Sequence, residues 1–148
     1  MNRSEAEYRD LILGYLFFRR DSLQAGKALI AELQSRGGSL TPKEMAEFVR
    51  RLESGAFGFK FSKHNFYRNV LRTFMNMGFI GKAPRLDRAT MKTVMVYRPI
   101  EQPIPARRPD NPSFWYVAYE ICSWWNGLMF SRGGASPAQQ QVGGPTSG

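Results

Sequence analysis

The spacing of apolar residues changes close to Gly78 in this 148-residue chain, and this change constrains the fold more than any other feature. Before Gly78, apolar residues recur every three or four positions, as on one face of an α-helix. After Gly78, residues 79–82 form a short strand-like run, and residues 90–98 alternate between apolar and polar side chains, as in a half-buried β-strand. Since a pattern of one period does not fit the other structure, we predict a mostly α-helical fold with a small β-hairpin.

The N-terminal part of the chain predicts a helix over about residues 4–20 and a second helical segment that ends at Gly37-Gly38. Asp21 or Ser22 is a candidate cap for the second segment, and the residues leave open whether a kink or one continuous helix joins the two. The first segment holds enough apolar residues to be buried on more than one side: Tyr8, Leu11, Ile12, Leu13, Tyr15, Leu16, Phe17 and Phe18.

The run Thr41-Pro42-Lys43-Glu44 has the form of a capping box with proline at the first helical position, and it predicts a helix that ends at Ser54-Gly55. Arg50, Arg51 and Glu53 are expected to face outward from this helix. Its expected buried residues are Met45, Phe48, Val49 and Leu52.

Ser62 is expected to cap a further helix, residues 62–77, which Gly78 terminates. The side opposite its buried face carries basic and amide side chains and no acidic residue. The expected buried residues are Phe66, Val70, Leu71, Phe74 and Met77.

The hairpin is predicted from a short strand at residues 79–82, a turn at residues 84–88 and a second strand at residues 90–98. Four basic residues are expected at or near its tip: Lys82, Arg85, Arg88 and Lys92.

Five prolines between residues 99 and 112 predict an extended linker, which we place at residues 101–112 after a domain of residues 1–100. Ser113 is expected to cap a last, aromatic helix, residues 113–130. Residues 131–148 hold few large apolar groups, so we expect a disordered tail.

The positive charge of the chain is concentrated in one stretch. The net charge is +9, and residues 60–108 alone contain eleven Lys and Arg residues against two acidic residues. A segregated excess of this kind is typical of a surface that binds a polyanion, although an ordinary solvated face is the alternative.

Several classes of protein are disfavoured. One cysteine, Cys122, and one histidine, His64, argue against a disulfide framework and a zinc site. The sequence offers no glycine-rich phosphate loop, paired carboxylates or nucleophile beside a histidine, so we expect neither an enzyme nor a cofactor. Acidic residues near the N-terminus do not fit a signal peptide, and the last helix is short for a membrane span. We therefore expect a cytoplasmic protein without a membrane or metal partner.

The order of helix, short helix, longer basic helix and hairpin resembles the winged helix-turn-helix family. The residues that carry the resemblance are the run 41–44, helix 62–77 and a wing at residues 79–98, with Ser39-Leu40 as the short strand that such domains often contain. The resemblance covers about residues 8–100. The connection at residues 55–61 departs from it, because helix-turn-helix units usually join these helices with three or four residues.

The resemblance implies that the chain binds double-stranded DNA as a transcriptional regulator, with helix 62–77 in the major groove and the wing on the backbone. Arg68 and Arg72 would read guanine, and Asn65 and Asn69 would read adenine. Tyr67 could either stack on the nucleic acid or pack at the edge of the helix. Phosphate contacts are expected from Lys60, Lys63, Arg85, Arg88 and Lys92.

The aromatic helix is apolar on both faces, so it either completes the core of the chain, forms a homodimer or docks another protein. The dimer, which would read an inverted repeat, would use Trp115, Tyr119, Trp124, Trp125 and Leu128. The alternative function is that of a winged-helix adaptor between proteins, and an interfacial membrane binder is a third.

Overall fold

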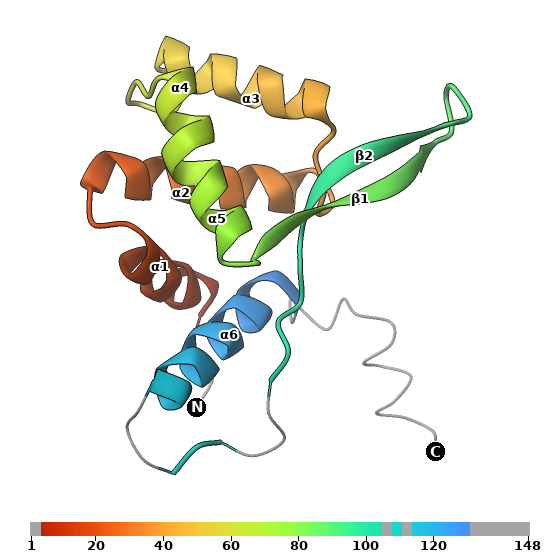
Figure 1. The fold of residues 1–148 in the computed structure, drawn as a ribbon. Coiled ribbons are helices and arrows are strands. Elements are labelled where there is room, and N and C mark those ends of the chain that lie inside the picture. The colour runs from red at the N-terminus through yellow and green to blue at the C-terminus, as the bar shows by residue number, and fades with distance from the viewer. Residues whose placement is uncertain (1–3, 105–107, 111–113, 131–148) are drawn as a thin grey trace. The chain divides into compact units, whose positions relative to one another are not determined.

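The computed structural model describes residues 4–104, 108–110 and 114–130. It divides into two compact units, a terminal unit (residues 1–12 and 101–148) and a central unit (residues 13–100). The fold is mostly α-helical with one antiparallel hairpin, as the change of period predicted (Figure 1). The elements are α1 (Glu5–Leu16), α2 (Arg20–Ser35), α3 (Pro42–Ser54), α4 (Lys63–Asn65), η1 (Phe66–Leu71), α5 (Arg72–Asn76), β1 (Ile80–Asp87), β2 (Lys92–Pro99) and α6 (Phe114–Phe130).

The first two helices are separate, and the break between them lies at residues 17–19, ahead of the candidate caps Asp21 and Ser22. Phe17 is buried, and its ring packs edge-on against Phe74 at 5.6 Å between centroids. Arg19 has an extended backbone and is the N-cap of α2, so neither Asp21 nor Ser22 caps this helix. The break leaves Phe18 fully exposed and Tyr15 half-exposed, and the expected burial of these two side chains was wrong.

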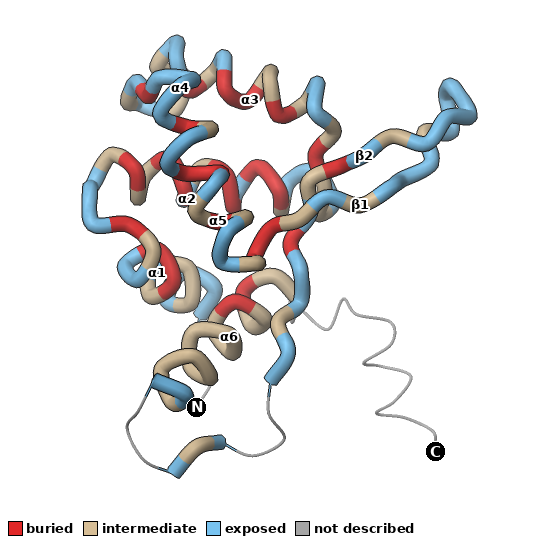
Figure 2. Tube along the Cα trace, in the orientation of Figure 1, coloured by how far each residue is buried: buried red, intermediate tan, exposed pale blue. Residues whose placement is uncertain are grey.

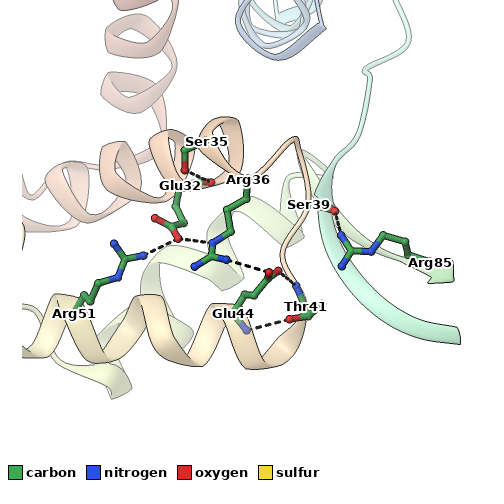
Figure 3. Close-up of polar contacts among 8 residues, drawn as sticks. All are labelled: Glu32, Ser35, Arg36, Ser39, Thr41, Glu44, Arg51 and Arg85. Atoms are coloured by element: carbon green, nitrogen blue, oxygen red, sulfur yellow. Dashed lines mark hydrogen bonds and ion pairs between the residues drawn. The ribbon is translucent and has the colours of Figure 1, made fainter. Parts of the chain in front are cut away.

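α3 begins and ends where the sequence predicted. The hydroxyl of Thr41 accepts a hydrogen bond from the backbone N–H of Glu44, whose carboxylate accepts one from the N–H of Thr41 (Figure 3). At the other end, Gly55 takes the left-handed conformation, with φ of 86°. The four residues expected to be buried on this helix are buried.

The predicted helix 62–77 is present as α4, η1 and α5, which we call the basic helix (residues 63–76). Its middle is a π-helix, which the sequence analysis did not anticipate. Because i→i+5 hydrogen bonds let five residues complete about one turn, Phe66 and Leu71 both lie on the buried side. Met77 is half-exposed and does not extend this side as expected, since the helix ends at Asn76 and Gly78 turns the chain with φ of 80°.

β1 and β2 pair from Ile80 opposite Pro99 to Asp87 opposite Lys92, and they project beyond the helices of the central unit (Figure 1). The turn therefore lies at residues 88–91, and the predicted turn at residues 84–88 was wrong. Pro84 is tolerated inside β1 because this strand is the outer edge of the sheet among the described residues.

The expected short strand at Ser39-Leu40 is a single bridge. Leu40 and Tyr97 exchange two backbone hydrogen bonds of 2.9 and 2.8 Å. This bridge attaches the base of the hairpin, on the β2 side, to the loop that precedes α3.

The buried sides of α2, α3 and the basic helix form the core of the central unit (Figure 2). Phe48 of α3 meets Phe66 of the basic helix edge-on at 5.5 Å, and both side chains are fully buried. Leu29 and Leu33 of α2 are fully buried as well. The basic helix is therefore anchored on one side while its polar side is left to the solvent.

A buried carboxylate joins α2 to α3. Glu32, 8% exposed, accepts from Arg36 at 2.8 Å and from Arg51 at 2.6 Å, and Arg36 also reaches Glu44 at 3.0 Å (Figure 3). Arg51 thus turns back toward α2 and does not face outward as expected. Burial raises the pKa of Glu32, but the hydrogen bonds from Arg36 and Arg51 outweigh it, so the net pKa is lowered.

In the terminal unit, α6 occupies residues 114–130, matching the predicted aromatic helix. The backbone of Gln102 exchanges two hydrogen bonds, of 2.8 and 2.9 Å, with the amide of Asn126, so the start of the linker is held to this helix. Arg108 forms an ion pair of 3.3 Å with Glu120. The expected cap Ser113 and the tail at residues 131–148 lie outside the described residues.

Candidate nucleic-acid interface

The basic helix presents the side that the sequence analysis proposed as a DNA-reading surface. Its side chains reach solvent because the opposite side is anchored in the core by Phe66, Val70 and Phe74. The following candidate residues of the helix are exposed: Lys63, Asn65, Arg68, Asn69 and Arg72.

An open hollow lies along one flank of this helix. It is lined by Glu53, Ser62, Lys63, His64, Tyr67, Arg68 and Arg72. Arg68 and Arg72 therefore share one surface, as their spacing suggested, although the π-helix changes the turn between them. Asn65 and Asn69 do not line the hollow.

Tyr67 is half-buried and packs edge-on against Phe66 at 5.5 Å, which favours packing at the helix edge over free stacking. Burial raises the pKa of Tyr67, and Tyr97 adds a smaller contribution. The phenol therefore remains protonated at neutral pH, and its hydroxyl can donate a hydrogen bond into the hollow.

Glu53 is a member of this surface that the sequence analysis had assigned only to an outward position on α3. Its carboxylate accepts a 2.9 Å hydrogen bond from the backbone N–H of Lys63, ten residues further on. The carboxylate of Glu53 thus occupies the start of the basic helix, and it would compete with a phosphate for the backbone N–H of Lys63. The loop at residues 55–61 brings Glu53 and Lys63 together, and no local sequence signal encodes this contact.

Two pairs of exposed side chains lie next to each other along the basic helix. Arg68 approaches His64 at 3.5 Å, and the amide of Asn69 approaches that of Asn65 at 3.4 Å. Hydrogen bonds of this length are weak. These contacts orient the side chains only weakly, so a ligand can replace them with a small loss of free energy.

The basic residues of the hairpin are spread along its length. Arg88 and Lys92 lie at the tip, as expected, but Lys82 lies near the base, with its ammonium 5.3 Å from the ring centre of Tyr97. Arg85 lies midway and donates a 2.7 Å hydrogen bond to Ser39 (Figure 3). Lys82 and Arg85 are thus away from the tip, because the turn falls later than predicted. Lys60, in the loop before the basic helix, is exposed.

The aromatic helix α6 offers less to a partner than its composition suggested. Trp125 is 0% exposed and Leu128 is 1% exposed, so these two candidate dimer residues belong to the protein's own core. Tyr119 and Trp124 are half-buried. Trp115 is 71% exposed, and its neighbour Phe114, which was not a candidate, is 74% exposed.

Within residues 4–104, 108–110 and 114–130, no three His, Cys, Asp or Glu side chains are grouped so as to hold a metal ion. In the same residues, no helix combines the length and the apolar character needed to cross a membrane.

Comparisons of the chain with protein-family models, with curated proteins and with solved structures gave no match.

Proposed function

We propose that the chain binds double-stranded DNA, with the basic helix in the major groove and the hairpin on the neighbouring backbone. The observation that carries the proposal is the exposed side of the basic helix, where Lys63, Arg68 and Arg72 line one hollow. The sequence of residues 63–76 contains no acid, and a polyanion is the ligand that such a surface attracts.

The connectivity supports the same proposal. A bridge at Leu40, the capped helix α3, the basic helix and the hairpin follow one another in the order of the winged helix-turn-helix family. In that family the helix corresponding to residues 63–76 enters the major groove, which is wide enough to admit it. The basic helix and the hairpin, which both carry an excess of positive charge, then contact the same DNA duplex.

Each candidate side chain has a role in this proposal. Arg68 and Arg72 contact guanine bidentately, and the adjacent amides of Asn65 and Asn69 contact adenine. Arg88 and Lys92 at the tip of the hairpin bind phosphates, together with Lys60 and Lys63. Arg85 changes its partner from Ser39 to a phosphate or keeps the hairpin attached to the loop.

The proposed regulator acts as a homodimer on an inverted repeat. The support is the adjacent exposed pair Phe114 and Trp115 at the start of α6, because neighbouring exposed apolar side chains are typical of a protein–protein contact.

A winged-helix adaptor between proteins is the second candidate function, and Glu53 favours it. The carboxylate of Glu53 gives the hollow a mixed charge, and a surface of mixed charge fits a protein partner better than it fits DNA.

Binding of labelled random duplex DNA, with single-stranded DNA and double-stranded RNA as competitors, tests the proposal. We expect the labelled duplex to bind, and unlabelled duplex DNA to displace it at lower concentrations than either of these two competitors. A matched pair of variants locates the surface: Arg72→Ala should weaken binding, whereas Lys27→Ala, which removes one charge from an exposed position on α2, should not. Equal effects of the two variants, or no duplex binding, would overturn the proposal.

A further inference from the structure

The outer half of the hairpin has two unlike faces. The strand register places Pro84 opposite Met95 and Leu86 opposite Thr93 on one face, and the alternate pairs on the other. Leu86 is 51% exposed and Met95 is 48% exposed, so the first face offers apolar side chains to solvent. An apolar face that no other part of the described chain covers is typical of a surface that contacts a partner.

The turn adds a third exposed apolar side chain in an unusual conformation. Met91 is 71% exposed and has φ of 59°, the left-handed region that glycine or asparagine adopts with less strain. The N–H of Met91 donates to the carbonyl of Asp87 and closes the turn. The turn thus holds a long apolar side chain at a position where the backbone favours glycine, and such strain is a pointer to function.

The charges around these side chains indicate what covers them. Arg85, Arg88 and Lys92 lie in the same half of the hairpin, against Asp87 alone, whose carboxylate accepts from the N–H of Ala89. A second copy of this basic tip would be repelled. An anionic partner with an apolar interior fits both the charge and the apolar side chains, and duplex DNA has phosphates outside and stacked bases inside.

We infer that the tip of the hairpin enters the minor groove and inserts Met91, supported by Leu86, between two base pairs, so that the DNA bends. Leucine and methionine side chains act as wedges of this kind in minor-groove proteins. The inference rests on the proposed DNA binding and extends it, because the hairpin then deforms the duplex as well as binding its backbone. Pyrimidine–purine steps, which unstack most easily, are the expected sites.

The test uses the full chain and a duplex with fluorophores at both ends and 2-aminopurine at a central TA step. At saturating wild-type protein, we expect the ends to approach each other and the 2-aminopurine emission to rise as its stacking is lost. Met91→Gly removes the wedge and relieves the strained turn. It should abolish both signals and reduce affinity about tenfold, without lowering the melting temperature of the protein.

Arg88→Ala is the matched control, since it removes a charge from the same turn and keeps the wedge. This variant should bind more weakly but still bend the duplex when saturated. Salt-dependent binding without bending, or bending that survives in Met91→Gly, would overturn the inference and leave the proposed function standing. Absence of any duplex binding would overturn both.

Flotation with vesicles of phosphatidylcholine and phosphatidylserine tests whether the tip of the hairpin binds an anionic membrane surface instead of DNA. We expect no flotation of the wild type. Flotation that Met91→Gly abolishes would assign the tip to a membrane surface and contradict insertion into DNA.

Discussion

At the scale of single residues, the side chains proposed to read bases differ from those proposed to bind phosphates in what their loss should do. Arg68→Ala or Arg72→Ala should cost about 1–3 kcal/mol at a specific site and relax the sequence preference. Arg88→Ala or Lys92→Ala should weaken binding to all sequences alike and reduce the salt slope by about one. Selection from random duplexes, followed by titration of the selected site, measures both effects. Identical behaviour of the helix and hairpin variants would refute the geometry.

Glu53 allows a test of the same surface in the opposite direction. Glu53→Gln keeps an acceptor for the N–H of Lys63 but removes a negative charge from the hollow. The DNA-binding proposal expects affinity for duplex DNA to rise about threefold at low salt, with the gain lost at high salt. Titrations at two salt concentrations check this. Unchanged affinity would place the bound DNA away from the hollow and strengthen the adaptor alternative.

At the scale of helices and strands, the predictions that held depended on local signals. The capping box at Thr41 and the glycine at Gly55 set the ends of α3, since both act within a turn of the chain. The position of the break before α2, the π-helix and the late turn of the hairpin were missed. The turn was placed too early because Pro84 was taken for a turn residue, whereas Asp87 accepts from the N–H groups of Ala89 and Met91 and closes the turn at residues 88–91. Phe17 at the break and Leu71 in the π-helix are both buried, as their apolar character predicted, although the backbone around them was not.

The candidate site was predictable to the same extent. A periodic pattern identifies the side of the basic helix that faces solvent, so its exposed basic and amide residues were found. Glu53 joins the hollow through a contact across ten residues, and Met91 takes its position from a turn that was placed too early. Burial of Trp125 depends on packing that the composition of α6 does not encode.

The join between α2 and α3 gives a prediction for stability. Glu32→Gln should destabilise the fold by about 2 kcal/mol at neutral pH, because Arg36 and Arg51 lose a buried charged acceptor. The folded-state pKa of Glu32 is below its unfolded value, so its contribution is present above about pH 5 and is lost as the pH falls through the lowered pKa.

Denaturant unfolding of wild type and Glu32→Gln at pH 7 and pH 3 tests this prediction. The difference between the two proteins should be large at pH 7 and shrink at pH 3. A difference that does not depend on pH would mean that the ion pairs contribute nothing beyond packing.

At the scale of the whole molecule, assembly depends on the start of α6. The buried Trp125 is a poor probe, since its loss would damage the core, whereas Trp115 is exposed. If the homodimer forms there, Trp115→Ala should shift the sedimentation mass toward the monomer at protein concentrations where the wild type is dimeric. It should also remove the preference for inverted repeats over half-sites. A wild type that is monomeric at high concentration would refute the dimer.

The central claim is that one basic surface, formed by the basic helix and the hairpin, binds the backbone of duplex DNA. The most direct measurement is the affinity for a duplex across a series of salt concentrations, because each phosphate contact releases condensed counterions. With about four to six contacts, we expect the logarithm of the binding constant to fall with the logarithm of salt at a slope of about −4 to −5. A slope near zero would contradict the claim.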